Sequence, residues 1–421
     1  MALFPLFTFI SLYLIISIVM GDFYKVPITV AFLVSAIVAV ATLKGKPLPE
    51  RLKVFSRGAS SENMILMILI FILAGAFASS AKEMGSIDNT VSLALTYLPP
   101  GMLMAGIFLA ACFISISVGT SVGTVVALIP IASGLAESTG TNTAMMCAVV
   151  VGGAFFGDNL SFISDTTVVA TQTQGCKMSD KFRANLFIVI PAAVMIFLLY
   201  MVIGSNIGTP ADIHEADFLK VLPYLVVLVA AAIGLNVLVV LTIGIALTGL
   251  IGIIGGTFDI FGWMQSMNTG ILGMAELIIV TMLAGGMLET VRENGGINLI
   301  INLITRHIDS RRGGEAAIAA LVTIVNFCTA NNTVAIITVG PIARQISERF
   351  RIDPRRSASI LDSFSCFAQG IIPYGAQLLM AGGLAAIAPI EIIPYLFYPY
   401  ALGICAVMAI ITGRPRRFTE K

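Results

Sequence analysis

Charged residues are scarce in this chain. They make up 11% of its 421 residues, whereas about 25% is usual in a soluble protein, and hydrophobic residues make up 57%. Apolar runs of about 18 residues or more, each long enough to cross ~30 Å of hydrocarbon, recur along the whole length. No stretch has the composition of a soluble domain. The sequence therefore predicts an all-α polytopic membrane protein with about 10–11 transmembrane segments and two re-entrant hairpins.

Side chains that usually carry enzyme chemistry are also few. The chain has two histidines, His214 and His307, and its six cysteines are scattered through apolar segments. Neither residue type shows the spacing of a metal centre or of a disulfide framework. Walker-type phosphate loops and catalytic triads are absent as well. We therefore expect no enzyme activity, no catalytic residues, no cofactor and no nucleic-acid partner, and ATP-driven transport is disfavoured.

The basic residues are unevenly distributed. Five clusters hold 20 of the 24 lysines and arginines, at 44–57, 177–183, 306–315, 344–356 and 413–421. Short cytoplasmic loops of membrane proteins retain such residues. A layout with two re-entrant hairpins places all five clusters on one side of the membrane. We therefore predict that the N- and C-termini are both cytoplasmic.

One stretch is strongly polar inside this apolar chain. Residues 157–167 read GDNLSFISDTT and place two aspartates among hydroxyl and amide side chains. A carboxylate within the membrane is costly and usually has a partner or a function. Oxygen ligands of this kind suit a hard cation such as Na⁺, and a desolvated carboxylate also takes a proton readily. Competition between the two ions for Asp158 and Asp165, the candidate Na⁺ ligands, is the chemistry of Na⁺/H⁺ exchange.

Three blocks of sequence recur in the same order in the second half of the chain. AGAFASSAKEMGSI (74–87) resembles AGGMLETVRENGGI (284–297), and residues 117–137 resemble residues 328–348. The third block pairs GDNLSFISD with LDSFSCFAQ (361–369). In the predicted layout, the two copies run through the membrane in opposite directions, which is the inverted symmetry of many secondary transporters. The third pairing sets Asp158 against Asp362 and Asp165 against Gln369.

Each copy is expected to contain a hairpin with a polar tip, followed by a broken helix. The tips are 119–124 and 329–333, and the helix breaks are 157–167 and 361–370. Non-helical backbone at membrane depth is tolerated only around a cavity or inside protein, where its free amides and carbonyls can bind ions. The candidate ion- or substrate-binding residues at these four places are Thr120, Ser121, Asp158, Asn159, Ser161, Ser164, Asp165, Thr166, Asn331, Asn332, Thr333, Asp362, Ser365 and Gln369. The same side chains could instead serve as helix caps or hairpin-tip structure.

The segment GGAFFGDNLSFISDTTVVATQTQGCKMSDKFRAN (152–185) resembles the signature region of the NhaC family of Na⁺/H⁺ antiporters. The resemblance extends to GDFYKVPITVAFLVSAIVAV and FSRGASSENMILMILIFILAGAFA, and so covers most of the chain. The hairpin tips are similar to the Ser-Asn-Thr motif of the ion transporter superfamily, with ANNTVAIITVGPI (330–342) as the closer copy. The resemblance implies exchange of Na⁺ and H⁺ across the cytoplasmic membrane, an elevator-type mechanism, and usually a homodimer.

The resemblance also suggests a division of the chain into scaffold and transport segments. Residues 1–60 would be N-terminal scaffold helices, 61–185 the first transport repeat, 186–268 scaffold or connecting helices, 269–391 the second transport repeat, and 392–421 the last helix and basic tail. Related proteins include carriers of organic acids and amino acids. A Na⁺- or H⁺-coupled carrier of a small amino or carboxylic acid therefore stays open beside the antiporter. A channel or a non-transporting scaffold is disfavoured by the polar break in each repeat.

Overall fold

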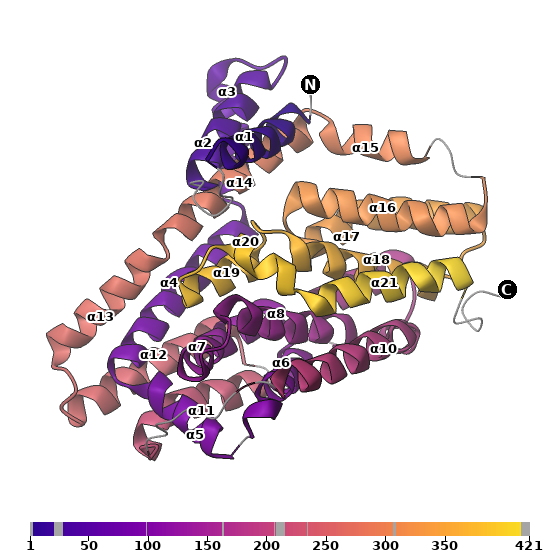
Figure 1. The fold of residues 1–421 in the computed structure, drawn as a ribbon. Coiled ribbons are helices and arrows are strands. Elements are labelled where there is room, and N and C mark those ends of the chain that lie inside the picture. The colour runs from indigo at the N-terminus through magenta and orange to yellow at the C-terminus, as the bar shows by residue number, and fades with distance from the viewer. Residues whose placement is uncertain are drawn as a thin grey trace.

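The protein folds as an all-helical assembly in a computed structural model (Figure 1). The structure describes residues 3–20, 28–97, 99–161, 164–205, 207, 215–233, 235–305 and 309–413. The helices of the first half are α1 (Phe4–Met20), α2 (Ile28–Thr42), α3 (Leu48–Ala59), α4 (Glu62–Glu83), α5 (Ser86–Tyr97), η2 (Pro100–Met102), α6 (Leu103–Val118), α7 (Ser121–Thr139), α8 (Thr143–Leu160), α9 (Asp165–Gln174) and α10 (Met178–Gly204). Those of the second half are α11 (Phe218–Ala232), α12 (Val237–Ile254), α13 (Ile260–Gly273), α14 (Ala275–Glu293), α15 (Gly296–Thr305), α16 (Arg311–Thr329), α17 (Asn332–Arg349), α18 (Pro354–Ile371), α19 (Ala376–Ala385), α20 (Pro389–Ile392), η3 (Ile393–Tyr395) and α21 (Phe397–Thr412). His214, His307 and the basic tail from 414 onward lie outside the described residues.

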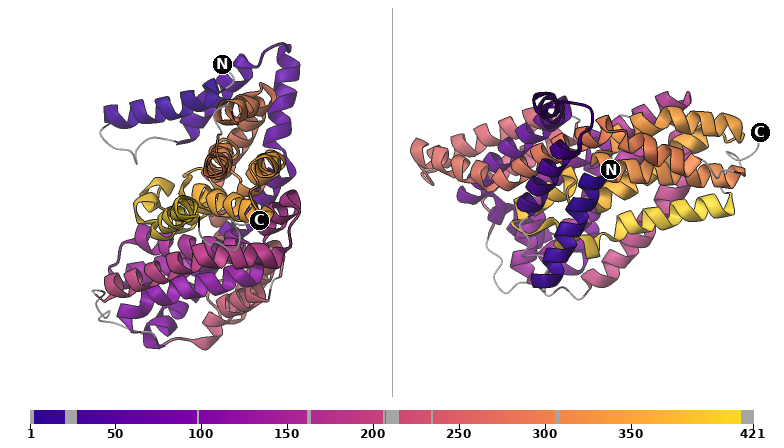
Figure 2. Two further views of the ribbon diagram at one scale, coloured as in Figure 1. Left: turned by 90° about the vertical axis from the view of Figure 1, so that its right-hand side faces the viewer. Right: turned by 90° about the horizontal axis from the view of Figure 1, so that it is seen from above.

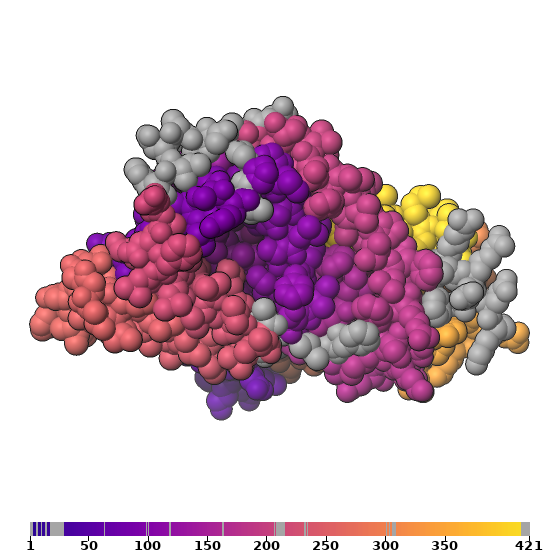
Figure 3. Space-filling model, turned by 90° about the horizontal axis from the view of Figure 1, so that it is seen from below, coloured from indigo at the N-terminus to yellow at the C-terminus, as the bar shows by residue number. Residues whose placement is uncertain are grey.

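Many of these helices are membrane-compatible. Within the described ranges, six are long and apolar enough to cross a membrane, or seven if a bent pair at 354–395 counts as one span, and four shorter apolar helices accompany them. Large apolar side chains such as Phe187, Ile254 and Phe261 are exposed on the outside. In the view from below, the segment containing α12 and α13 extends to one side of the surface formed by α10 (Figure 3). This confirms a polytopic membrane protein; the exact number of crossings stays a prediction.

The second half repeats the first at a nearly constant spacing. The starts of α7, α8 and α9 lie 211 residues before the starts of α17, α18 and α19, and α10 begins 211 residues before α20. α10 and α21, the last helices of the two halves, pack side by side (Figures 1 and 2). The correspondence therefore extends from the hairpins through the broken helices to the end of each half.

Left-handed backbone follows the same spacing. Among the described residues, three non-glycine residues have positive φ angles: Ala330 (50°), Arg351 (52°) and Ala386 (55°). Each lies 211 residues after a glycine with positive φ, at positions 119, 140 and 175. A left-handed conformation costs a residue with a Cβ roughly 1–2 kcal/mol, and glycine avoids this cost. These turns are therefore imposed by the fold, because the second half keeps them without glycine.

Close helix crossings are repeated as well. A Cβ on Gly58 of α3 would lie 2.3 Å from the carbonyl oxygen of Gly285 in α14. In the matching crossing, a Cβ on Gly75 of α4 would lie 2.3 Å from the carbonyl oxygen of Gly270 in α13. Small residues allow helix backbones to approach this closely in membrane proteins. Each half thus inserts its third helix against the fourth helix of the other half.

The predicted break in the second repeat is wrong by about two helical turns. α18 runs unbroken through 361–370, and the break lies at 372–375 instead. Ile372 has extended backbone (φ −82°, ψ 114°) because it precedes Pro373, whose ring disfavours the helical conformation of the residue before it. The first break, at 161–164, falls inside the predicted 157–167, although residues 162 and 163 are not described.

This shift changes which residues correspond in the two halves. At a spacing of 211, the counterpart of Asp158 is Gln369, and the counterpart of Asp362 is Val151. The predicted pairing of Asp158 with Asp362 is therefore wrong. It rested on a chance similarity between two polar stretches that occupy different turns of α8 and α18.

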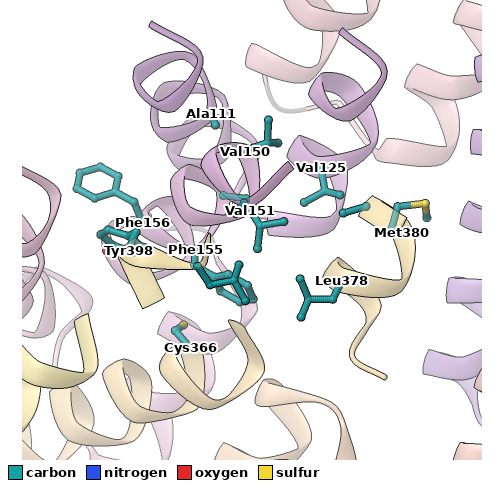
Figure 4. Packing of buried hydrophobic residues seen from close by; sticks show 14 of the residues in the cluster. Ala111, Val125, Val150, Val151, Phe155, Phe156, Cys366, Leu378, Met380 and Tyr398 are labelled. Atoms are coloured by element: carbon teal, nitrogen blue, oxygen red, sulfur yellow. The ribbon is translucent and has the colours of Figure 1, made fainter. Parts of the chain in front are cut away.

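α8 forms the centre of the core. All its residues from 146 to 160 are buried, and it packs against α6, α7, α10, α18, α19 and α21. Figure 4 shows Val150, Val151 and Phe155 of α8 among side chains of neighbouring elements, including Leu378 and Cys366. The buried apolar part of α8 therefore fixes the position of its polar end.

Candidate functional site

A central cavity of about 150 Å³ lies where the two hairpin tips and the two helix breaks meet. The tip of the α6–α7 pair contributes Thr120, which is the N-cap of α7, and the tip of the α16–α17 pair contributes Asn331, the N-cap of α17. The breaks between α8 and α9 and between α18 and α19 supply the facing walls. Segments far apart in the sequence therefore form one polar chamber.

Ten of the fourteen predicted residues line this cavity: Thr120, Ser121, Asp158, Ser164, Asp165, Thr166, Asn331, Asn332, Thr333 and Gln369. The structure adds Gln377, which the sequence analysis did not single out. The sequence feature that could have identified Gln377 is its position as a polar residue after Pro373 in an otherwise apolar segment. The role of these residues in binding stays a prediction.

Four predicted residues do not line the cavity; three of them donate hydrogen bonds to nearby backbone, and the fourth is in an ion pair. Asn159 donates its side-chain amide to the carbonyl of Phe155 at 2.9 Å, and Ser161 donates to the carbonyl of Ile116 at 2.9 Å. Ser365 donates to the carbonyl of Asp362 at 3.0 Å, as a hydroxyl within a helix often does. Asp362 belongs to a separate buried ion pair, described below.

Asp158 is the buried carboxylate of the cavity. It is 4% exposed, lies in the last turn of α8, and its Oδ1 accepts a hydrogen bond from the backbone N–H of Ser121 at 3.1 Å. The N-terminus of α7 therefore points its partial positive charge at this carboxylate. Asp165 begins α9 and is exposed, so the two aspartates differ sharply in environment.

In the second half, a neutral chain of amides occupies the matching position. Gln369 donates to the carbonyl of Ala330 at 3.1 Å and to Oε1 of Gln377 at 3.0 Å. Gln377 in turn donates to the hydroxyl of Ser121 at 2.9 Å. Asp158 and Gln369 thus each contact the hairpin tip of their own half, and only the first half places a carboxylate there.

Two basic residues used above as cytoplasmic markers are buried. Lys181, in the first turn of α10, places its Nζ 2.8 Å from Oδ2 of Asp362. Arg356 pairs with Glu315 at 3.0 Å and donates to the carbonyl of Ala409 at 2.7 Å. Both residues lie in helices and not in the short loops that the basic clusters predicted, and the side of the membrane on which they lie stays a prediction. The sequence feature that could have indicated the burial of Lys181 is Asn185, a second polar residue four positions later on the same face of an apolar helix.

Two further cavities flank the central one. Each has a volume of about 330 Å³, and they lie at opposite ends of α4. Residues of the first, such as Gly58 and Arg292, correspond to Gly270 and Lys82 of the second at a spacing of 210–212. The first cavity shares Asn331 with the central cavity, whereas the second shares no residue with it. The two flanking cavities are therefore similar in size, and only the first shares a lining residue with the central cavity.

Comparison with known proteins places the chain among membrane carriers. The sequence model of the Na⁺/H⁺ antiporter family matches residues 1–205 and 205–414, and this division coincides with that of the two structural halves. The chain is 23% identical to a malate-2H⁺/Na⁺-lactate antiporter of Bacillus subtilis (strain 168), over 99% of this chain and 95% of that protein. It is 25% identical to the Na⁺/H⁺ antiporter NhaC of the same organism, over 83% of each chain. Among solved structures, the YdaH transporter of Alcanivorax borkumensis is 13% identical, with 92% of this chain and 99% of that chain covered and a TM-score of 0.45.

Proposed function

The chain belongs to the Na⁺/H⁺ antiporter family, and from this premise we propose that it exchanges Na⁺ for H⁺ across the cytoplasmic membrane, with Asp158 carrying either ion. The family consists of transporters and not of enzymes, so transported ions are the expected ligands and no cofactor is involved. The observation that carries the proposal is the position of Asp158, a buried carboxylate in a cavity that both hairpin tips and both helix breaks line.

The surroundings of Asp158 suit a monovalent cation. A buried carboxylate without a counter-charge is unfavourable, so it favours a bound proton or a bound cation. The hydroxyls of Ser121 and Thr166 and the side chains of Asn331 and Asn332 line the same cavity and offer neutral oxygens. One carboxylate with neutral ligands balances one positive charge. Na⁺ and H⁺ therefore compete for the same group, and this competition couples their movements.

The paired access cavities support alternating access. In the proposed cycle, the central cavity connects first with the cavity at the start of α4 and then with its counterpart at the end of α4. The two hairpins would be re-entrant and would move with the broken helices in an elevator-type motion. Segments 1–60 and 186–268 would form the scaffold of a homodimer, with the N- and C-termini in the cytoplasm. Site-specific labelling of single cysteines from either side of the membrane tests this layout.

Exchange can be tested in proteoliposomes that contain a pH-sensitive dye. A Na⁺ pulse without any organic solute should drive protons out of the compartment that receives Na⁺. Asp158→Asn should abolish the signal, whereas Glu348→Gln, which removes an exposed carboxylate far from the cavity, should not. Full exchange in the Asp158→Asn protein would contradict the proposal.

A second candidate function is coupled transport of a small organic acid. A cavity of about 150 Å³ is much larger than a bare Na⁺ requires and is similar to one that holds benzene. The N-termini of α7 and α17 both face it and could hold a carboxylate. The relative described as a malate-2H⁺/Na⁺-lactate antiporter fits this possibility. A proton signal that appears only when lactate or malate is present would favour this function over simple ion exchange.

A further inference from the structure

Lys181 is enclosed by oxygen atoms in the way that a bound metal cation would be. Its Nζ lies 2.8 Å from Oδ2 of Asp362, 2.8 Å from the carbonyl oxygen of Asn159 and 2.7 Å from the hydroxyl of Thr167. The side chain is 1% exposed, and that of Asp362 is fully buried. These oxygens come from α8, α9 and α18, so the ammonium group joins three elements that surround the transport cavity.

Asn185 and two buried amide oxygens accompany this cluster. Asn185 donates to Oδ2 of Asp362 at 2.8 Å and to the carbonyl of Asn159 at 3.1 Å, which holds both acceptors in place. Within the described parts of the chain, the side-chain oxygens of Asn159 and Asn185 are buried and accept no hydrogen bond. A buried acceptor without a donor is unusual in a folded protein. Both oxygens belong to residues that contact the ion pair, so acceptors without donors lie in its immediate surroundings.

The fold itself does not require charge at this place. At a spacing of 211, the counterparts of Lys181, Asn185 and Asp362 are Ile392, Leu396 and Val151. All three counterparts are apolar and fully buried. An ion pair that only filled space could be replaced by such a packing, often with a gain in stability. The charged pair between α10 and α18, beside the first helix break, therefore points to a role in ion binding.

We propose that Lys181 is a tethered cation that permanently fills a second cation site, formed by Asp362, Asn159 and Thr167. The proposal rests on the proposed function only in taking the transported ion to be Na⁺. With the ammonium in place, Asp362 is neutralised and Asp158 is the remaining carboxylate buried in the cavity. Thr167 also donates to the carbonyl of Asp158 at 3.4 Å, so the filled site positions the last turn of α8. One monovalent ion is then bound in each transport cycle.

Equilibrium stability can test the proposal without any transport. In an Asp158→Asn background, which silences the proposed transport site, Lys181→Met should open the second site to Na⁺. We expect NaCl, raised from ~1 mM to ~300 mM against choline chloride, to increase the melting temperature of Asp158→Asn/Lys181→Met by about 3 °C or more. The Asp158→Asn protein and the triple variant with Asp362→Asn should show no Na⁺-specific increase.

The outcomes separate this inference from the proposed function. If Na⁺ fails to stabilise folded Asp158→Asn/Lys181→Met, the second site does not exist; if that protein aggregates at both NaCl concentrations, the Hill coefficient of Lys181→Met decides. The same result obtained while the wild-type protein still exchanges Na⁺ for H⁺ would overturn the inference alone. In Lys181→Met with Asp158 intact, the Hill coefficient for Na⁺ should rise from about 1 toward 2, and Asp362→Asn should return it to about 1. An unchanged coefficient in the Lys181→Met protein would also contradict the tethered cation.

Discussion

The two halves of the molecule share a backbone plan and differ in their buried charges. Both have a hairpin tip after a left-handed residue, a broken helix and a glycine crossing to the other half. At matched positions, Asp158 of the first half corresponds to Gln369 of the second. Asp362 and Arg356 of the second half correspond to Val151 and Met145 of the first. The comparison teaches that repeated geometry builds the cavity, while single substitutions in one half determine its chemistry.

The largest expected effect concerns the buried Arg356–Glu315 pair. At a spacing of 211, its counterparts in the first half are Met145 and Met104. Arg356→Met alone leaves the buried Glu315 with only the longer contact to Arg311, at 3.7 Å, and should lower the free energy of unfolding by about 3 kcal/mol. The double variant Arg356→Met/Glu315→Met copies the first half and should recover most of that loss. Thermal unfolding in detergent measures both, and a double variant no more stable than the single one would refute the equivalence.

Exchanging the polar residues of the cavity tests its asymmetry. Asp158→Gln gives the first half the residue type of the second and should reduce Na⁺-driven proton exchange by ~100-fold or more, because a charge-assisted partner of the ion is lost. Gln369→Asn removes neutral hydrogen bonds and should reduce exchange only about threefold. Initial rates from the liposome dye assay provide the comparison. Equal losses in the two variants would mean that the halves contribute alike.

The two glycine crossings should respond alike to an added methyl group. Gly58→Ala and Gly270→Ala each place a Cβ near 2.0–2.3 Å from a carbonyl oxygen of the facing helix, so the backbones must separate. We expect each to lower the free energy of unfolding by about 1–3 kcal/mol. Gly273→Ala, three residues further along α13, meets no atom within 4 Å and is the matched control. A large difference between the two crossing variants would disprove their equivalence.

The smallest expected effect concerns the left-handed turns. Ala386→Gly should stabilise the protein by about 1 kcal/mol, because glycine relieves the strain of φ 55° and Ala386 is exposed. Gly175→Ala at the matching turn should destabilise the protein by a similar amount, because alanine is strained in a left-handed conformation. Packing should add little to this effect, since the new Cβ would meet only Arg344 atoms at 3.8 Å or beyond. Melting temperatures that move in opposite directions would confirm the prediction. A fall in both would show that packing and not backbone strain dominates there.

Much of the site was predictable because its signals are local. Polar residues at a hairpin tip interrupt apolar helices visibly in sequence, and Asn331 and Thr120 are both N-caps of the helices that follow. The first break was located for the same reason. The second was misplaced because the polar run at 361–369 resembled it, whereas the residue that ends α18 is Ile372, before Pro373. The unequal exposure of Asp158 and Asp165 could not be inferred, since it depends on the N-terminus of α7.

By itself, the sequence determined that the chain is a helical membrane protein with an internal repeat. Hydropathy and the residues that begin and end helices act over short distances along the chain, so both can be read locally. Only the tertiary structure decided the register of the repeat and the partners of its charges. Lys181 has the same charge and the same neighbours in sequence whether it faces water or Asp362. Its environment is set by residues up to 181 positions away, on helices that packing alone brings together.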